Sequence, residues 1–154
     1  MININVFSNE KAWSRKLKKK EQFFNEVCKA FPKKYKFLNK KISLSLLLSN
    51  NENIKKLNKE FRKKNKSTDI LSFPFYEKKV LNYKIKSKQK EIYLGDIIIN
   101  LNSIKTKGNL NKFTYEFNKI WIHGLAHLFG YTHKKNQDFF DMKRIEKKYI
   151  NILK

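Results

Sequence analysis

Several short stretches of the chain alternate apolar and polar residues or are apolar throughout, patterns typical of half-buried and buried β-strands. The predicted strands are Ile2–Phe7, Ile42–Leu48, Ile70–Phe75 and Ile92–Asn100. Pro74 is expected to stop the third strand, and Gly95 with Asp96 interrupts the fourth. We expect these segments to form one small sheet.

Outside the strands, apolar residues recur with the spacing of an amphipathic helix. The predicted helices are Trp13–Phe31, which Pro32 closes, a segment from Asn50 or Asn51 to about Lys64, a segment from about Lys112 onwards, and one from about Asn136 to Ile152. Strands and helices in this order indicate a single α+β (mixed α/β) domain over residues 1–154. We expect a small mixed sheet of about four strands packed by about five helices.

The charge of the chain narrows the classes of partner. Lys and Arg number 36 against 13 Asp and Glu, and the net charge of +23 favours a polyanion, with nucleic acid first. Nearly all of this charge is lysine, since Arg15, Arg62 and Arg144 are the only arginines. Because lysine, Asn and Ile are also enriched by an AT-rich genome, the charge supports a nucleic-acid partner without establishing it. The lysine-rich segment Lys78–Glu91 is expected to be a long basic connection, either a solvated loop or one that contacts RNA.

The remaining composition favours a cytoplasmic protein with no membrane partner. Cys28 is the only cysteine, so no internal disulfide can form, which is consistent with a reducing compartment. The first residues lack the apolar core of a signal peptide, and the apolar stretch Ile42–Leu48 is far too short to span a bilayer.

The three histidines of the chain fall within one short stretch as His123, His127 and His133. His123 and His127 are spaced i, i+4, which places both imidazoles on one face of a helix. Gly130 offers the left-handed residue that ends a helix, and the turn after it can bring His133 back towards the other two. Three neutral imidazoles aimed at one point form a metal site at a helix C-terminus and its following turn, most simply tetrahedral zinc with a position left for water. The alternative is a structural role for histidines on an apolar helix.

The residues around the histidines limit the chemistry. Zincin proteases place a glutamate general base directly after the first histidine, but Gly124 stands there in this chain. Metal-bound hydroxide is then the simplest base, since zinc lowers the pKa of bound water to about 7. A phosphodiester in its transition state also needs a nearby cation, and the planar fork of Arg62 suits this better than a lysine. On residue chemistry alone, a plain surface position for Arg62 is the favoured alternative.

Three motifs of the chain resemble the YbeY family of metal-dependent endoribonucleases, which are implicated in ribosomal RNA maturation. His123–His133 is similar to the signature H-G-x-L-H-L-x-G-Y-D-H. Leu57–Arg62 followed by Thr68–Pro74 resembles L-N-x-x-[YF]-R…T-D-V-L-S-F-P, and Leu94–Ile97 resembles L-G-D-I. The order of the motifs and the overall length also fit, so the resemblance covers essentially the whole chain.

The resemblance implies a small mixed sheet with helices around it and a basic cleft at the metal. It implies one Zn²⁺ held by His123, His127 and His133, with Arg62 as the catalytic and substrate-binding arginine that contacts phosphate. The implied activity is single-strand-specific cleavage of ribosomal RNA, notably in maturation of the 3′ end of small-subunit (16S) RNA and in ribosome quality control. The implied partners are RNA and the small ribosomal subunit or its assembly factors.

Some positions depart from the family pattern or have two explanations. Ala126 replaces a leucine, and Thr132 replaces the aspartate before the third histidine. A hydroxyl can hydrogen-bond an imidazole but cannot carry negative charge, so Thr132 weakens any role of that carboxylate as an orienting group or proton shuttle. Asp69 and Asp96 match acidic positions of the family, although turn capping explains them at least as well.

Other functions compete with a ribonuclease. A ribosome-associated RNA-binding assembly factor would use the basic surface and keep the metal site for structure, and a closed site with four ligands would favour it. A metallohydrolase with a non-nucleic substrate is disfavoured by the missing glutamate and by the positive charge. For a ribonuclease, the attacking group is either water or the ribose 2′-hydroxyl.

Overall fold

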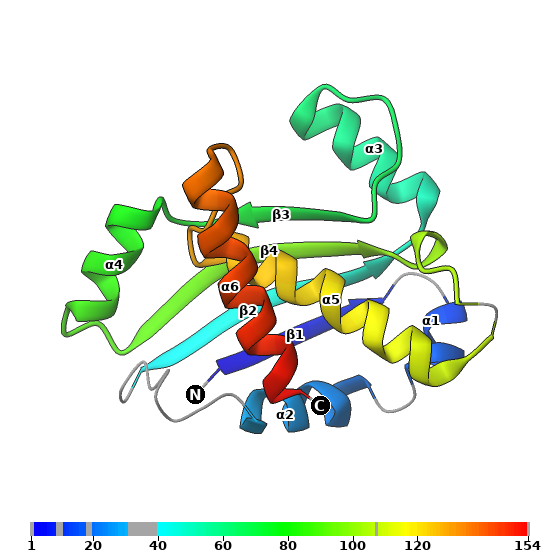
Figure 1. Cartoon of the computed structure of the whole chain (residues 1–154), viewed down its shortest axis with the longest axis horizontal. Coiled ribbons are helices and arrows are strands. Elements are labelled where there is room, and N and C mark those ends of the chain that lie inside the picture. Colours follow the sequence, from blue (N-terminus) through cyan, green and yellow to red (C-terminus); the bar gives the residue numbers. More distant parts are fainter. Residues whose placement is uncertain (1, 9–10, 18–19, 31–39, 107, 154) are drawn as a thin grey trace.

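The computed structural model describes residues 2–8, 11–17, 20–30, 40–106 and 108–153 (Figure 1). Its elements, in chain order, are β1 (Ile2–Ser8), α1 (Ala12–Lys16), α2 (Lys20–Ala30), β2 (Lys41–Ser49), α3 (Asn51–Arg62), β3 (Ile70–Pro74), α4 (Lys78–Lys86), β4 (Glu91–Asn100), the 3₁₀ turn η2 (Leu101–Ser103), α5 (Leu110–Leu128) and α6 (Asn136–Ile152). Among the described residues, no helix has the length and apolar character needed to cross a bilayer.

The four strands form one mixed sheet in the order β1-β2-β4-β3. β1, β2 and β4 run parallel to one another, whereas β3 is antiparallel to β4 and forms an edge of the sheet. The predicted α+β class with a small mixed sheet is therefore confirmed, and six α-helices accompany the sheet in the described part of the chain.

One face of the sheet carries the main core. Figure 1 shows α5 crossing this face, with α6 beside it and α1 and α2 at the β1 side. Every second residue of β2 is fully buried there, which explains its alternating sequence. The aromatic part of this core comes from the helices, where rings meet at centroid distances near 6 Å, as in the Trp13–Phe117 pair at 5.7 Å and the Phe24–Trp121 pair at 5.9 Å. Helix α3 packs on the opposite face, where Ile54 meets Leu71 and Ile98.

A β-bulge explains the interruption predicted in the fourth strand. Ser43 of β2 pairs with Tyr93, but Ser45 already pairs with Asp96, so β4 contains one extra residue at this point. The extra residue keeps apolar side chains from both halves of β4 in the main core and turns Asp96 to the other face. Gly95 makes this possible, since its φ is +131° and a Cβ there would lie 2.1 Å from the Phe73 carbonyl oxygen.

The prediction of a single helix over Trp13–Phe31 is wrong. α1 ends at Lys16 and α2 begins at Lys20. At the end of α1, Leu17 leaves helical geometry with φ −120° and ψ 82°. The sequence explains this break between the two helices. A continuous helix would need an apolar residue at position 20 or 21 to extend its buried face, but Lys20 and Glu21 stand there. Phe31 and Pro32, which were expected to end the helix, lie outside the described residues.

The prediction of a loop over Lys78–Glu91 is also wrong, because Lys78–Lys86 forms α4. Leu81 is buried and Ile85 packs against the main core, and their i, i+4 spacing gives this short basic helix one apolar face. Two predicted boundaries shift by two residues for local reasons. Lys63 adopts a left-handed conformation that ends α3 at Arg62, and Asn109 caps α5 by accepting a hydrogen bond from the Lys112 amide at 3.0 Å.

Substitution of Gly95 by alanine should destabilise the fold strongly. The new Cβ would collide with the neighbouring strand, and the positive φ adds strain of roughly 1–3 kcal/mol. Gly108→Ala is the matched control, since Gly108 also has a positive φ (+81°) but no atom within 4 Å of the added Cβ. Urea unfolding should show a larger loss of unfolding free energy for Gly95→Ala, and equal losses would contradict the close approach of β3 and β4.

Candidate functional site

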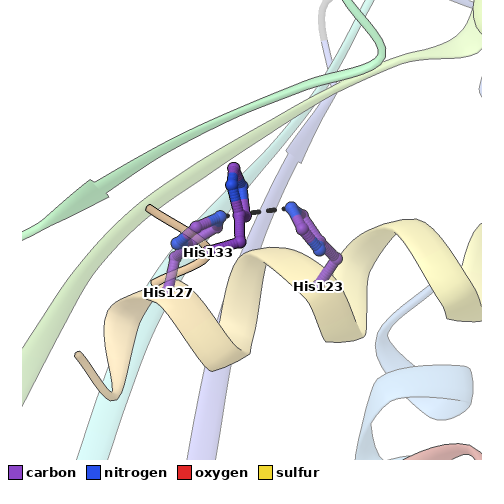
Figure 2. A group of neighbouring side chains, drawn as sticks. All are labelled: His123, His127 and His133. Carbon is purple, nitrogen blue, oxygen red and sulfur yellow. Dashed lines mark hydrogen bonds between the residues drawn. The ribbon is translucent and has the colours of Figure 1, made fainter. Parts of the chain in front are cut away.

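The three histidines singled out in the sequence come together at the end of α5 (Figure 2). His123 and His127 lie one turn apart on α5, and His133 follows in the segment that leads to α6. One ring nitrogen from each histidine lies within 4.8 Å of the others, and the Nε2 atoms of His123 and His127 are 3.1 Å apart. Two bonds of about 2.0–2.1 Å to a shared zinc ion can span that separation, so the donor set is compatible with a metal site.

Gly124 brings this part of α5 close to the sheet. A Cβ at this position would lie 2.7 Å from Ile70 Cδ1 and 3.0 Å from Ile97 Cγ2, so the helix rests directly on β3 and β4. His123 precedes Gly124 and His127 follows one turn later, and both are therefore held by this contact. The glycine that argues against a zincin-type base thus has a packing role in this fold.

Gly130 reverses the chain after α5. Its φ is +85°, and its amide donates to the His127 carbonyl at 2.9 Å. The Tyr131 amide donates to the Ala126 carbonyl at 3.1 Å, which closes the end of the helix. The chain then returns His133 to the side of the helix that carries the other two imidazoles, as Figure 2 shows.

Hydrogen bonds orient two of the rings. His127 Nδ1 lies 3.0 Å from the Tyr131 carbonyl oxygen, and His123 Nδ1 lies 2.6 Å from Glu146 Oε1. A carbonyl can only accept, so His127 Nδ1 carries the proton, and the carboxylate favours the same tautomer of His123. Both Nε2 atoms are then free of protons and face the third histidine, which is the arrangement a metal ligand requires.

Glu146 is the site residue that the sequence interpretation missed. It lies on α6, and its side chain is only 10% exposed. Burial alone would raise the pKa of its carboxyl group, but hydrogen bonds from His123 and from Lys143 (2.9 Å) together hold that pKa below its ordinary value. Its spacing could have indicated a position on the buried face of the helix, since Glu146 stands four residues after the buried Met142 and three before the buried Tyr149.

The pKa of His127 is lowered to about 4. Burial is the main cause, followed by the repulsion that a protonated His123 would exert, while the hydrogen bond to Tyr131 acts in the opposite direction. The positive charge of Arg62 also lowers the pKa of His127. The structure therefore brings Arg62 into the neighbourhood of His123, His127 and His133, the histidine triad. Arg62 ends α3, and its Nη2 donates to the Ser72 carbonyl of β3 at 3.3 Å. At neutral pH His127 is therefore an uncharged imidazole near a permanent cation.

The other acidic positions have distinct surroundings. The Thr132 hydroxyl donates to Asp138 at 3.3 Å, so a carboxylate from the first turn of α6 stands beside the residue that departs from the family pattern. Asp69 accepts from the Ile70 amide at 2.9 Å, as expected for a residue that caps a turn. Asp96 accepts from the Tyr93 hydroxyl at 2.7 Å on the sheet face opposite the main core.

Comparisons with known proteins agree with the motifs. A family model described as Endoribonuclease YbeY matches residues 5–154. The chain belongs to the YbeY family. A relative named Endoribonuclease YbeY from Pelagibacter ubique is 50% identical over 148 residues, covering 95% of this chain and 92% of the relative. One with the same name from Ehrlichia canis is 32% identical over 155 residues, covering 99% and 93%.

A solved structure supports the fold of this YbeY-family chain. The solution structure of TM1509 from Thermotoga maritima is similar with a TM-score of 0.58 and 25% sequence identity. The match covers 97% of this chain and 88% of that one. The family resemblance predicted from the histidine signature and its two companion motifs is thus confirmed over nearly the whole chain.

Replacement of His127 by alanine should remove a bound divalent metal. Loss of one imidazole of three should cost more than the roughly 10–100-fold in affinity that is typical when a group behind a ligand is changed. Metal analysis of the purified proteins after dialysis against a defined zinc buffer measures this.

Glu146→Gln is the graded comparison for that experiment, because it keeps a hydrogen-bond acceptor behind His123 but removes the charge. It should weaken metal binding by about 10–100-fold and so fall between the parent and His127→Ala. Equal metal content in all three proteins would show that the histidines do not bind the ion.

Proposed function

We propose that this protein is a single-strand-specific, metal-dependent endoribonuclease that acts in ribosomal RNA processing. The proposed role includes maturation of the 3′ end of 16S RNA and ribosome quality control, with the small ribosomal subunit or its assembly factors as partners in the cytoplasm. The observation that carries the proposal is the convergence of three imidazoles, with Arg62 close enough to act electrostatically on His127. The names of the family model and of the relatives support RNA as the substrate class.

We propose His123, His127 and His133 as the ligands of one Zn²⁺. The low pKa of His127 provides a neutral nitrogen donor at physiological pH, and the hydrogen bond of its Nδ1 to the Tyr131 carbonyl leaves Nε2 for the ion. A zinc ion held there supplies a Lewis acid and lowers the pKa of a bound water to about 7. Glu146 keeps the His123 ring in place from behind, because its carboxylate accepts the proton that faces away from the other histidines.

The number of candidate ligands favours catalysis over a purely structural ion. Within the described part of the chain, the group that can hold a metal has three members, all histidines. The carboxylate of Glu146 bonds to His123 and Lys143 and is therefore engaged behind the ligands. Three protein ligands leave a fourth position for water or substrate, as in catalytic zinc sites, whereas structural sites are closed by four.

We assign to Arg62 the stabilisation of the phosphoryl group. One Nη donates to the Ser72 carbonyl, which steadies the guanidinium at the β3 edge and leaves its other N–H groups for a ligand. A guanidinium can contact two phosphate oxygens at once and stabilise the charge that develops on them during cleavage. In the proposed reaction, Arg62 also orients the phosphate relative to the triad, because both belong to the same neighbourhood.

Arg62→Ala should lower the rate of RNA cleavage by roughly 10²–10³-fold, as removal of a preorganised donor commonly does. Arg62→Lys should recover only part of this loss, because lysine keeps the charge but lacks the bidentate fork. The measurement is single-turnover cleavage of a single-stranded RNA by zinc-loaded protein.

Arg144→Ala is the matched control for Arg62. Arg144 is exposed on α6 and pairs with Asp141 at 3.0 Å, on its own helix. The control should cleave at the parent rate. An Arg62→Ala protein with unchanged cleavage would overturn the role of Arg62, and a parent that cuts no RNA in any metal-loaded form would overturn the proposed function.

RNA binding should depend strongly on salt, because the net charge of +23 comes almost entirely from lysines that can replace counterions on the phosphates. If Z such contacts form, the logarithm of the binding constant should fall with the logarithm of salt concentration at a slope of about −0.7Z for single strands. Titrations of a labelled oligonucleotide at several salt concentrations measure the slope. A flat response would exclude a polyanionic partner.

A further inference from the structure

A groove lined by aromatic side chains opens on the sheet face opposite the main core. Phe7, Phe61 and Phe73 form its walls together with Leu47, and the space between them measures about 590 Å³, within the roughly 300–1,000 Å³ of small-molecule sites. Phe7 and Phe61 are 58% and 60% exposed, although both are large apolar residues. We call this feature, with its polar residues Ser45 and Asp96, the aromatic groove.

The β4 bulge places a carboxylate in this apolar surface. The extra residue at Gly95 turns Asp96 into the aromatic groove beside Ser45. Asp96 Oδ1 accepts from the Tyr93 hydroxyl at 2.7 Å, and that hydroxyl is also 3.0 Å from Ser45 Oγ. Within the described residues, the second oxygen of Asp96 accepts no hydrogen bond, so the groove combines apolar walls with an acceptor that lacks a donor.

The aromatic groove begins at residues next to Arg62 and to its partner Ser72. Phe61 directly precedes Arg62, and Phe73 directly follows Ser72, whose carbonyl holds Arg62. The rings of Phe61 and Phe73 meet edge to face with centroids 5.3 Å apart. A single strand whose phosphate is held by Arg62 would then have Phe61 and Phe73 as the nearest aromatic surface for an adjoining base.

We propose that the aromatic groove binds an unstacked base of the single-stranded RNA next to the phosphate held by Arg62. This inference rests on the proposed ribonuclease function. The base lies against Phe61 and Phe73, and its N–H groups donate to the free oxygen of Asp96. Aromatic stacking of splayed bases is the usual way in which proteins hold single strands, and carboxylates accept from base amino groups.

The chemistry of the groove favours a base over an apolar protein segment. A base offers two apolar faces and an edge with N–H donors, which match the phenylalanines and Asp96 at the same time. The net charge of +23 draws in the anionic backbone that carries the base. Guanine presents two adjacent N–H donors to a carboxylate and adenine and cytosine present an amino group, whereas uracil has one ring N–H. Uracil should therefore be the weakest occupant.

The test is a double-mutant cycle that combines one substitution in the protein with one change in the RNA. Parent and Phe61→Ala, both zinc-loaded, are compared on a single-stranded RNA that the parent cleaves and on the same RNA with an abasic nucleotide next to the cut. The readout is the half-saturating protein concentration in single-turnover cleavage. Loss of Phe61 alone or of the base alone should raise the half-saturating concentration by about tenfold or more. Loss of both should raise it no further than either single loss does, because the two groups contact each other.

Matched variants separate the groove from general effects. Tyr83→Ala removes another exposed aromatic residue, on α4 and outside the groove, and should behave as the parent does. Asp96→Asn should reduce the preference for guanine and cytosine over uracil at the tested position. If Phe61→Ala fails to fold, Phe7→Ala at the other wall serves in its place.

Several outcomes would overturn the inference. One is an unchanged half-saturating concentration in Phe61→Ala, and another is full additivity with the abasic RNA. A third is a change in the oligomeric state of Phe61→Ala with RNA cleavage unaltered, which would identify the groove as an interface between protein chains. If the parent cleaves no RNA, the proposed function fails, and fluorescence anisotropy with the same RNA pair then decides whether the groove holds a base.

Discussion

The contact of α5 with the sheet at Gly124 is the constraint on which the site depends. A Cβ at this position would lie 2.7 Å from Ile70 Cδ1 and 3.0 Å from Ile97 Cγ2, so any larger residue would push these side chains of β3 and β4 away from the helix. The histidine-bearing end of α5 therefore sits against the edge strand β3. The same strand offers the Ser72 carbonyl to Arg62 from the other side. Two helices on opposite faces of the sheet thus deliver their functional side chains to one edge, and that edge is rigid because it is hydrogen-bonded to β4.

Charge around the triad is arranged in a definite pattern. The imidazole of His127 is kept neutral by burial and by positive neighbours, while the carboxylate of Glu146 is kept ionised by His123 and Lys143. The carboxylate of Glu146 meets the Nδ1 side of His123, and the cation of Arg62 is close enough to act electrostatically on His127.

Much of this organisation could be read from local sequence. The strands were predictable because each is either alternating or a short apolar run, and the three-histidine cluster because i, i+4 spacing and a helix-ending glycine are local features. The break after Leu17 and the helix α4 were missed, because short helices leave few apolar positions from which to judge a period. Glu146 was missed because its partner lies 23 residues away and is reached only when α6 docks. Likewise, Gly95 indicated an irregularity in the fourth strand. The sequence could not predict the face to which Asp96 turns, because that depends on the register of β4 with β2.

The position of Glu146 on α6 makes the last described helix part of a linked equilibrium. A metal ion held by His123, as proposed, would increase the acidity of the opposite ring nitrogen and strengthen its hydrogen bond to the carboxylate. Metal binding and docking of α6 against α5 then favour one another, since each stabilises the state that the other requires. The strength with which α6 is attached to the body of the protein would then depend on whether the three histidines hold a metal ion.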